Sequence, residues 1–196
     1  MSDLSKRETF LLAMYKQMWD NIERHIMVVW QSVGVLGGAF AVSALVEKKL
    51  LSLDWAVTVV VLVAAWQVAH TIDAGYWYNR NLAIISNIER QFLEATDTAN
   101  IHPYFAERRP PKLLDHLKIQ FAFGTAVALL VLAYHFSRQV LPGIHAPWST
   151  FDFRKAIPYL TFVVCCGFLS GLHRHQTQKY TKNFLQSPVS RASDDS

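Results

Sequence analysis

Four long stretches of this chain lack every Asp, Glu, Lys and Arg side chain. They cover residues 26–46, 55–72, 119–136 and 157–172 of 196. A helix of about 20 such residues crosses the ~30 Å hydrocarbon layer of a bilayer. Lipid offers backbone groups no hydrogen bonds, so spanning segments of this kind form helices. The sequence therefore predicts an all-α integral membrane protein with four spans, which leaves little chain for a soluble catalytic domain.

The chain also lacks the short motifs that carry catalysis or hold metals. It contains no CxxC, HExxH, GxSxG or P-loop sequence. Its two cysteines, Cys165 and Cys166, are adjacent within the fourth stretch, where a structural disulfide is disfavoured. We interpret both as packing residues, and we expect no enzymatic activity, no metal site and no cofactor.

Charge is missing from the middle of the predicted spans. Asp54 and Asp73 stand only at the ends of the second stretch. Carriers coupled to protons or ions usually keep a charged residue near the bilayer midplane. Carriers also tend to have helices broken by Gly or Pro at matching places in two halves, and no convincing pair occurs here. Coupled transport is therefore disfavoured.

Lys and Arg are unevenly distributed between the segments that separate the stretches. The N-terminal, central and C-terminal segments hold 14 of the 19 basic residues, and the two remaining loops hold 5. Because basic residues concentrate in cytoplasmic loops, both termini and the central segment are predicted to lie inside a bacterial inner membrane. The net charge of +4 is then explained by topology and contact with anionic lipid, and no direct nucleic acid binding is expected.

The helices are predicted to extend beyond the lipid. Ser5 and Glu8 have the spacing of a capping box. If the chain reverses near residues 50–51, residues whose numbers sum to about 101 become neighbours. Helical extensions at 5–25 and 73–95 then form a hairpin in the cytosol.

The remaining spans complete the predicted architecture. The third and fourth spans form a second, shorter hairpin, which gives a four-helix bundle made of two hairpins. We expect one membrane domain over residues 1–186, followed by a polar, disordered tail over 187–196.

Small residues repeat at four-residue spacing inside the spans. Gly34 with Gly38 and Gly167 with Gly171 form GxxxG pairs, and Gly124 precedes Ala128 at the same spacing. Such residues let helix backbones approach closely in a membrane. Packing within one chain is the favoured interpretation. The alternative is that one of these faces joins copies of the chain into a homo-oligomer.

Histidines gather near the predicted inner boundary. His25 with His70, or His70 with His173, would supply two imidazoles for a haem. Interfacial histidines are more often polar anchors, so a haem-binding or quinone-binding subunit is the less favoured alternative. His135 lies near the opposite boundary and does not belong to this set.

A candidate binding site lies at the inner end of the second span. Its residues are Tyr76, Trp77, Asn79, Arg80 and Asn81, with His70 before them and Arg109 in the central connector. Gln67, Thr71 and Asp73 crowd the same end of the span, which could form a water-accessible cavity, a ligand site or a gate. In the central connector, Arg109 and nearby aromatic residues are types that anchor interfaces, so we predict that this side of the protein binds a soluble partner or ligand. The alternative is a polar helix end that meets lipid headgroups.

The run YWYNRNL at 76–82, followed by NIER at 87–90, stands beside two pairs of membrane helices with cytosolic extensions. This layout resembles small transmembrane effectors of bacterial antiphage defence systems, including four-helix Kiwa-type and nucleotide-signalling components. The resemblance covers the general layout and supplies no catalytic motif. It implies an oligomeric inner-membrane protein that a cytosolic partner activates, with membrane disruption or phage sensing as output. A membrane anchor or scaffold and a channel subunit are the alternatives.

Overall fold

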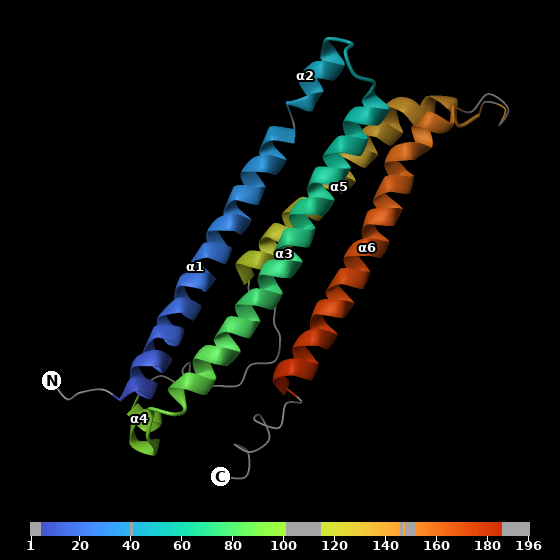
Figure 1. Cartoon of the computed structure of the whole chain (residues 1–196). Coiled ribbons are helices and arrows are strands. Elements are labelled where there is room, and N and C mark those ends of the chain that lie inside the picture. Colours follow the sequence, from blue (N-terminus) through green and yellow to red (C-terminus); the bar gives the residue numbers. More distant parts are fainter. Residues whose placement is uncertain (1–4, 40, 101–114, 146, 148–151, 186–196) are drawn as a thin grey trace. The chain divides into compact units, whose positions relative to one another are not determined.

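The structure is a computed structural model that describes residues 5–39, 41–100, 115–145, 147 and 152–185 (Figure 1). Every regular element among these residues is helical, as predicted. The α-helices are α1 (Lys6–Ala39), α2 (Val42–Glu47), α3 (Leu53–Glu89), α4 (Ala95–Asn100), α5 (Asp115–His135) and α6 (Ile157–Tyr180). Short π and 3-10 segments are η1 (Phe136–Val140), η2 (Leu141–Gly143), η4 (Phe153–Ala156) and η5 (Thr181–Leu185).

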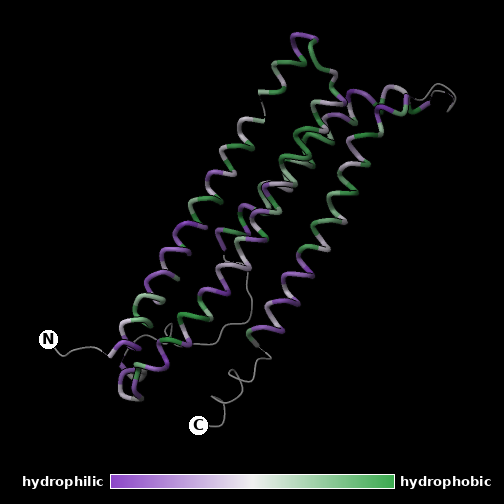
Figure 2. The backbone as a smooth tube through the Cα atoms, viewed as in Figure 1, coloured by the Kyte–Doolittle hydropathy of each residue, from purple (hydrophilic) through white to green (hydrophobic). Residues whose placement is uncertain are grey.

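Four helical segments are long and apolar enough to cross a membrane. They are Lys6–Glu47, Leu53–Glu89, Asp115–Gly143 and Phe153–Phe184, and each contains one of the four uncharged stretches. Figure 2 shows that hydrophobic residues recur along all four. Large apolar side chains such as Trp30, Leu130 and Val164 are exposed on them. Such a surface suits a multi-pass membrane protein, because lipid tails cover apolar side chains without cost.

Local sequence explains where α1 begins. The backbone N–H of Ser5 donates to Glu8 Oε2 at 2.7 Å, and the N–H of Glu8 donates to Ser5 Oγ at 3.3 Å. This reciprocal pair is the predicted capping box, which satisfies two N–H groups that have no partner inside the helix. The hydrogen bond from the Ser5 N–H also holds the pKa of the Glu8 carboxyl below its usual value.

The chain reverses between α2 and α3 without a glycine. Lys49 has a positive φ of 58°. Its N–H donates to the Val46 carbonyl at 2.9 Å, and the N–H of Leu50 donates to the Leu45 carbonyl at 2.9 Å. These two bonds form a Schellman motif, which ends a helix and turns the chain. The turn contains the position near residues 50–51 where a reversal was predicted.

The chain divides into two compact units. The first unit comprises Met1–Val28, Asp73–Leu113 and His175–Ser196, and the second comprises Val29–Ile72 and Leu114–Arg174. The single domain expected over residues 1–186 stays a prediction. The tail at 187–196 lies outside the described residues.

The first unit has its own apolar core. Met18 and Ile22 of α1 pack against Ile85 of α3, and partly buried aromatic residues surround them. Nearby, the Tyr15 hydroxyl donates to Glu89 Oε1 at 3.2 Å. The pairing of α1 residues with α3 residues follows the order expected from a reversal near residue 50.

Described residues of the second unit form two apolar clusters. The first contains Leu36, Ala39, Val60, Ala64, Val127 and Ala128, and the second contains Val57, Val61 and Leu132. Helix α6 adds the partly buried Phe162 to both clusters. Of the apolar stretch that contains α6, only 6% is buried, so α6 makes few apolar contacts with other described residues.

Candidate functional site

The predicted binding residues Tyr76, Trp77 and Arg80 form one cluster in the first unit. The Trp77 ring stacks on the His25 ring of α1, with centroids 5.8 Å apart and planes 11° apart. Arg80 Cζ lies 4.8 Å from the centroid of the same Trp77 ring, which is cation–π distance. The Tyr76 and Trp77 rings contact each other edge to face, with centroids 5.6 Å apart. Helix α3 therefore presents adjacent aromatic rings that hold cationic side chains.

Helix α6 joins the same cluster through two polar contacts. Lys179 Nζ lies 5.1 Å from the centroid of the Tyr76 ring. One helical turn away, Gln176 Nε2 donates to Asp73 Oδ1 at 2.9 Å. We call the set of His25, Asp73, Tyr76, Trp77, Arg80, Gln176 and Lys179 the aromatic–cationic cluster. Gln176 and Lys179 were missed in the sequence, because no local pattern shows which turn of α6 faces α3.

The other predicted site residues lie in different surroundings. Asn79 is buried, and its Nδ2 donates to the Gly75 carbonyl at 2.6 Å within α3. Asn81 is 1% exposed, and neither Oδ1 nor Nδ2 of its amide has a hydrogen-bond partner. His70 belongs to the second unit, where its ring contacts Trp66 edge to face at 4.5 Å. Arg109 lies outside the described residues.

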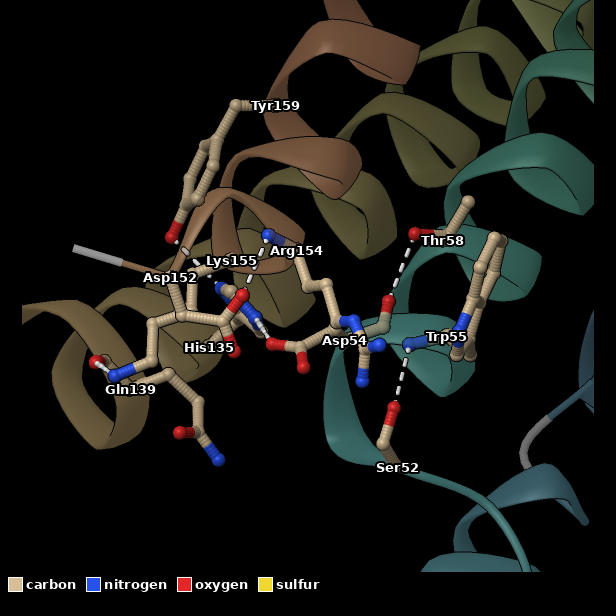
Figure 3. A network of polar contacts seen from close by, with 10 residues as sticks. All are labelled: Ser52, Asp54, Trp55, Thr58, His135, Gln139, Asp152, Arg154, Lys155 and Tyr159. Atoms are coloured by element: carbon tan, nitrogen blue, oxygen red, sulfur yellow. Dashed lines mark hydrogen bonds and ion pairs between the residues drawn. The ribbon is translucent and has the colours of Figure 1, made fainter. Parts of the chain in front are cut away.

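A second polar site links three helices of the second unit, and the sequence did not reveal it. Figure 3 shows His135 of α5 between Asp54 of α3 and Tyr159 of α6. His135 Nε2 lies 2.8 Å from Asp54 Oδ1, and Nδ1 lies 2.9 Å from the Tyr159 hydroxyl. His135 is fully buried, whereas the Asp54 side chain is 17% exposed. We call these three residues the Asp–His–Tyr triad.

The triad satisfies its imidazole completely. With a proton on Nε2, the ring donates to the Asp54 carboxylate and accepts the hydroxyl proton of Tyr159 at Nδ1. Nearby, Lys155 Nζ donates to the Gln139 carbonyl at 3.0 Å, so the triad lies beside a second link between the ends of α5 and α6. The geometry suits an interhelical clamp. The sequence showed Asp54 and His135 at span ends but gave no sign that they face each other.

No protein-family model, curated protein or solved structure matches the chain.

The histidines of the haem hypothesis have aromatic neighbours. His25 contacts Trp77, and His70 contacts Trp66. Among the described residues, no group of three or more His, Cys, Asp or Glu side chains could hold a metal ion. Haem ligation by two histidines stays a hypothesis that visible absorbance of the purified protein would test.

The predicted small-residue packing differs between helices. A Cβ on Gly124 would meet Val68 Cγ2 at 3.0 Å and collide with Gln67 Oε1, so α5 approaches α3 closely at this glycine. In contrast, a Cβ on Gly34, Gly38, Gly167 or Gly171 would meet no atom of a described residue within 4 Å beyond its own local helix. Close packing within the chain is therefore found at Gly124 and not at the two GxxxG pairs.

If the Gly34 and Gly38 face joins copies of the chain, replacing both residues by Leu should lower the oligomer order. The added side chains would separate backbones that approach closely between subunits. Light scattering of the detergent-solubilised protein measures this change. The Gly167→Leu/Gly171→Leu pair tests the other candidate face, on α6, since it adds the same volume at equally open positions. An unchanged mass in both variants would contradict a subunit-joining role for either face.

Proposed function

We propose that this chain is a multi-pass protein of a bacterial inner membrane, with both termini in the cytoplasm. In this proposal the second unit carries the spans, and the first unit is a cytosolic helical hairpin that binds a soluble protein partner or trigger. Binding changes the arrangement of the membrane helices, which produces an output at the bilayer. The protein acts without catalysis and as a homo-oligomer.

The aromatic–cationic cluster is the observation that carries this proposal. It gathers Trp77, Tyr76 and Arg80 of α3 with side chains from two other helices. Trp, Tyr and Arg are the residue types that most often dominate binding energy at protein interfaces. A partner that engages this cluster contacts α1, α3 and α6 together, so its binding can act on three helices at once.

The contacts within the cluster are weak enough to be exchanged. A cation–π contact contributes about 0.5–1 kcal/mol at an exposed site and about 2 kcal/mol when desolvated, and a hydrogen bond to a charged group contributes about 1.5–3 kcal/mol. The Lys179–Tyr76 and Gln176–Asp73 contacts of α6 together then amount to about 2–5 kcal/mol. A partner that binds at about 1 μM provides roughly 8 kcal/mol, so it can replace these contacts with its own.

The biological role that we propose for this protein is antiphage defence. This role is supported by the layout of the membrane helices and by the run 76–90, which resemble transmembrane defence effectors. The output would then be membrane disruption after a cytosolic partner reports infection. An anchor for a soluble partner would use the same cluster but would leave the membrane intact.

Induced expression in a bacterial host, followed by growth and a membrane-potential dye, tests the effector role. We expect the wild-type chain to slow growth and depolarise the membrane. Combining Trp77→Ala with Lys179→Ala should weaken both effects. The double variant removes the Trp77 ring of α3 that stacks on His25 of α1, and it removes the Lys179 charge of α6 that contacts the Tyr76 ring of α3. A loss of about 1.4 kcal/mol of coupling corresponds to a tenfold weaker response.

The matched control is Trp30→Ala, which removes an exposed indole of α1 in the second unit. It should retain the wild-type response at equal membrane abundance. If the wild-type chain changes neither growth nor membrane potential, with or without infection, the passive anchor is favoured. If the control variant loses the response as fully as the cluster variant, the cluster has no specific role.

A further inference from the structure

Among the described residues of the second unit, three side-chain polar atoms are buried without a hydrogen-bond partner. They are Gln67 Oε1 on α3 and both amide atoms, Nε2 and Oε1, of Gln120 on α5. Gln67 is 0% exposed, and Gln120 is 4% exposed. Burying an amide group without a hydrogen bond is costly, and lipid cannot supply the missing partner. These atoms therefore point to a polar group that is bound among them.

The two glutamines are held next to each other. Gln67 Nε2 donates to the Gln120 backbone carbonyl at 3.2 Å. One turn along α3, the fully buried Thr71 donates its hydroxyl to the Gln67 carbonyl at 3.0 Å. One turn along α5, Gly124 leaves the space that the Gln67 amide occupies. The geometry thus fixes the Gln67 side chain and leaves its Oε1 available as an acceptor.

The unpaired atoms define the chemistry of the group that could bind to them. Two amide oxygens require hydrogen-bond donors, whereas the Gln120 Nε2 group requires an acceptor. A group that only accepts, such as a ketone carbonyl, would leave both oxygens unpaired. A water molecule donates two hydrogen bonds and can pair with both oxygens, whereas an alcohol hydroxyl donates one and pairs with one of them; both can accept from Gln120 Nε2.

The occupant is also neutral. Residues 55–72 and 119–136 contain no Asp, Glu, Lys or Arg, and His135 is already bonded to Asp54 and Tyr159. A charged ligand would therefore lack a counter-charge in a low-dielectric site, which is costly. We propose that Gln67 and Gln120 form a binding site for a neutral hydroxyl group, supplied by water or by the alcohol of an amphiphile.

The two glutamines lie near the ends of the uncharged stretches, so a molecule from the aqueous side has a short path to them. The uncharged stretch of α3 ends at Ile72, five residues after Gln67, which is roughly 8 Å along a helix. Gln120 is only the second residue of the uncharged stretch on α5. The site therefore lies close to one end of both stretches, where water and lipid headgroup alcohols can reach it. This inference does not depend on the partner-binding role of the first unit.

Cysteine labelling in membrane vesicles tests access by water. Gln120→Cys is introduced into a chain that carries Cys165→Ala and Cys166→Ala, which removes both native thiols. The probe is a small cationic methanethiosulfonate reagent that reacts with thiols in contact with water. The matched control is Ala64→Cys, at a position 1% exposed within the apolar cluster of the same unit. We expect rapid labelling of Gln120→Cys and slow labelling of Ala64→Cys.

Native mass spectrometry is the second measurement, and it detects a bound amphiphile. If Gln120→Cys does not react, the hydroxyl comes from an amphiphile, and the wild-type chain should carry a bound species that Gln120→Leu loses. Gln67→Cys gives an independent labelling position if Gln120→Cys does not give a monodisperse protein.

The absence of both labelling and a bound amphiphile would overturn the proposal. In that case Gln67→Leu and Gln120→Leu should each raise the unfolding temperature, because each substitution removes unpaired polar atoms. With a bound hydroxyl, the same substitutions leave the unfolding temperature unchanged or lower it.

Discussion

Replacing Gly124 by Leu should lower the stability of the second unit by about 2–4 kcal/mol. Its Cβ alone would lie 3.0 Å from Val68 Cγ2 and 3.3 Å from Gln67 Cδ, and it would collide with Gln67 Oε1. Overpacking of this kind costs about 1–3 kcal/mol. Moving the Gln67 amide also breaks its hydrogen bond to the Gln120 carbonyl, which is worth about 1 kcal/mol.

Unfolding of the detergent-solubilised protein by a denaturing detergent or by heat measures this loss. Gly167→Leu is the matched control, because its position faces open space on α6. Its effect should stay within about 0.5 kcal/mol, as for substitutions away from packed features. Equal losses in the two variants would show that the close approach of α5 to α3 is not what limits stability.

Replacing His135 by Leu should lower the stability of the second unit by about 3 kcal/mol. Leaving a buried hydrogen-bonding group unpaired costs about 1–3 kcal/mol, and more for a charged group. The substitution leaves two such groups unpaired, but the Asp54 side chain keeps some contact with solvent, so we expect a loss of about 3 kcal/mol. The substitution leaves the Asp54 carboxylate without its imidazole and the Tyr159 hydroxyl without its acceptor.

Two further variants separate the triad from a general effect of the substitution. His175→Leu changes an exposed histidine of α6 and should have little effect. In the double variant Asp54→Leu/His135→Leu, part of the lost stability should return, because the Asp54 carboxylate is no longer left unpaired, whereas the Tyr159 hydroxyl still lacks its acceptor. If the double variant loses the sum of the two single effects, the residues are not coupled.

The predicted fold and the structure agree where local sequence determines the outcome. The absence of charge over 55–72 is enough to indicate a long apolar helix, because a single charged residue in lipid is so costly. The Ser5 and Glu8 capping box is equally local, since both partners lie within one turn. The turn at Lys49 follows from the spacing of the uncharged stretches, although a lysine at a position that usually holds glycine gives no signal of its own.

The candidate sites were predictable only in part, because the sequence shows proximity only between residues that are close along the chain. Tyr76, Trp77 and Arg80 are close in sequence, so their proximity needs no tertiary information. Their partners His25 and Lys179 lie on other helices, and only the relative rotation of those helices brings them together.

The triad and Gln120 were missed for two different reasons. Asp54, His135 and Tyr159 are separated by more than 20 residues each, and a hydropathy profile does not show which faces they share. Gln120 carries no charge, so a search for charged residues within the spans passes over it. The sequence indicated Gln67 as part of a polar span end, but only the folded chain shows that both glutamines are buried.

The sparse burial of α6 has a consequence for how this helix responds to its surroundings. If α6 spans a bilayer as proposed, lipid tails replace its apolar contacts at almost no cost, so the hydrogen bonds and the cation–π contact near its ends hold it to α5 and α3. A bilayer of different thickness would then shift the depth of those ends, at a cost of a fraction of a kcal/mol per ångström of mismatch. We therefore expect the registry of α6 to depend on the composition of the host membrane.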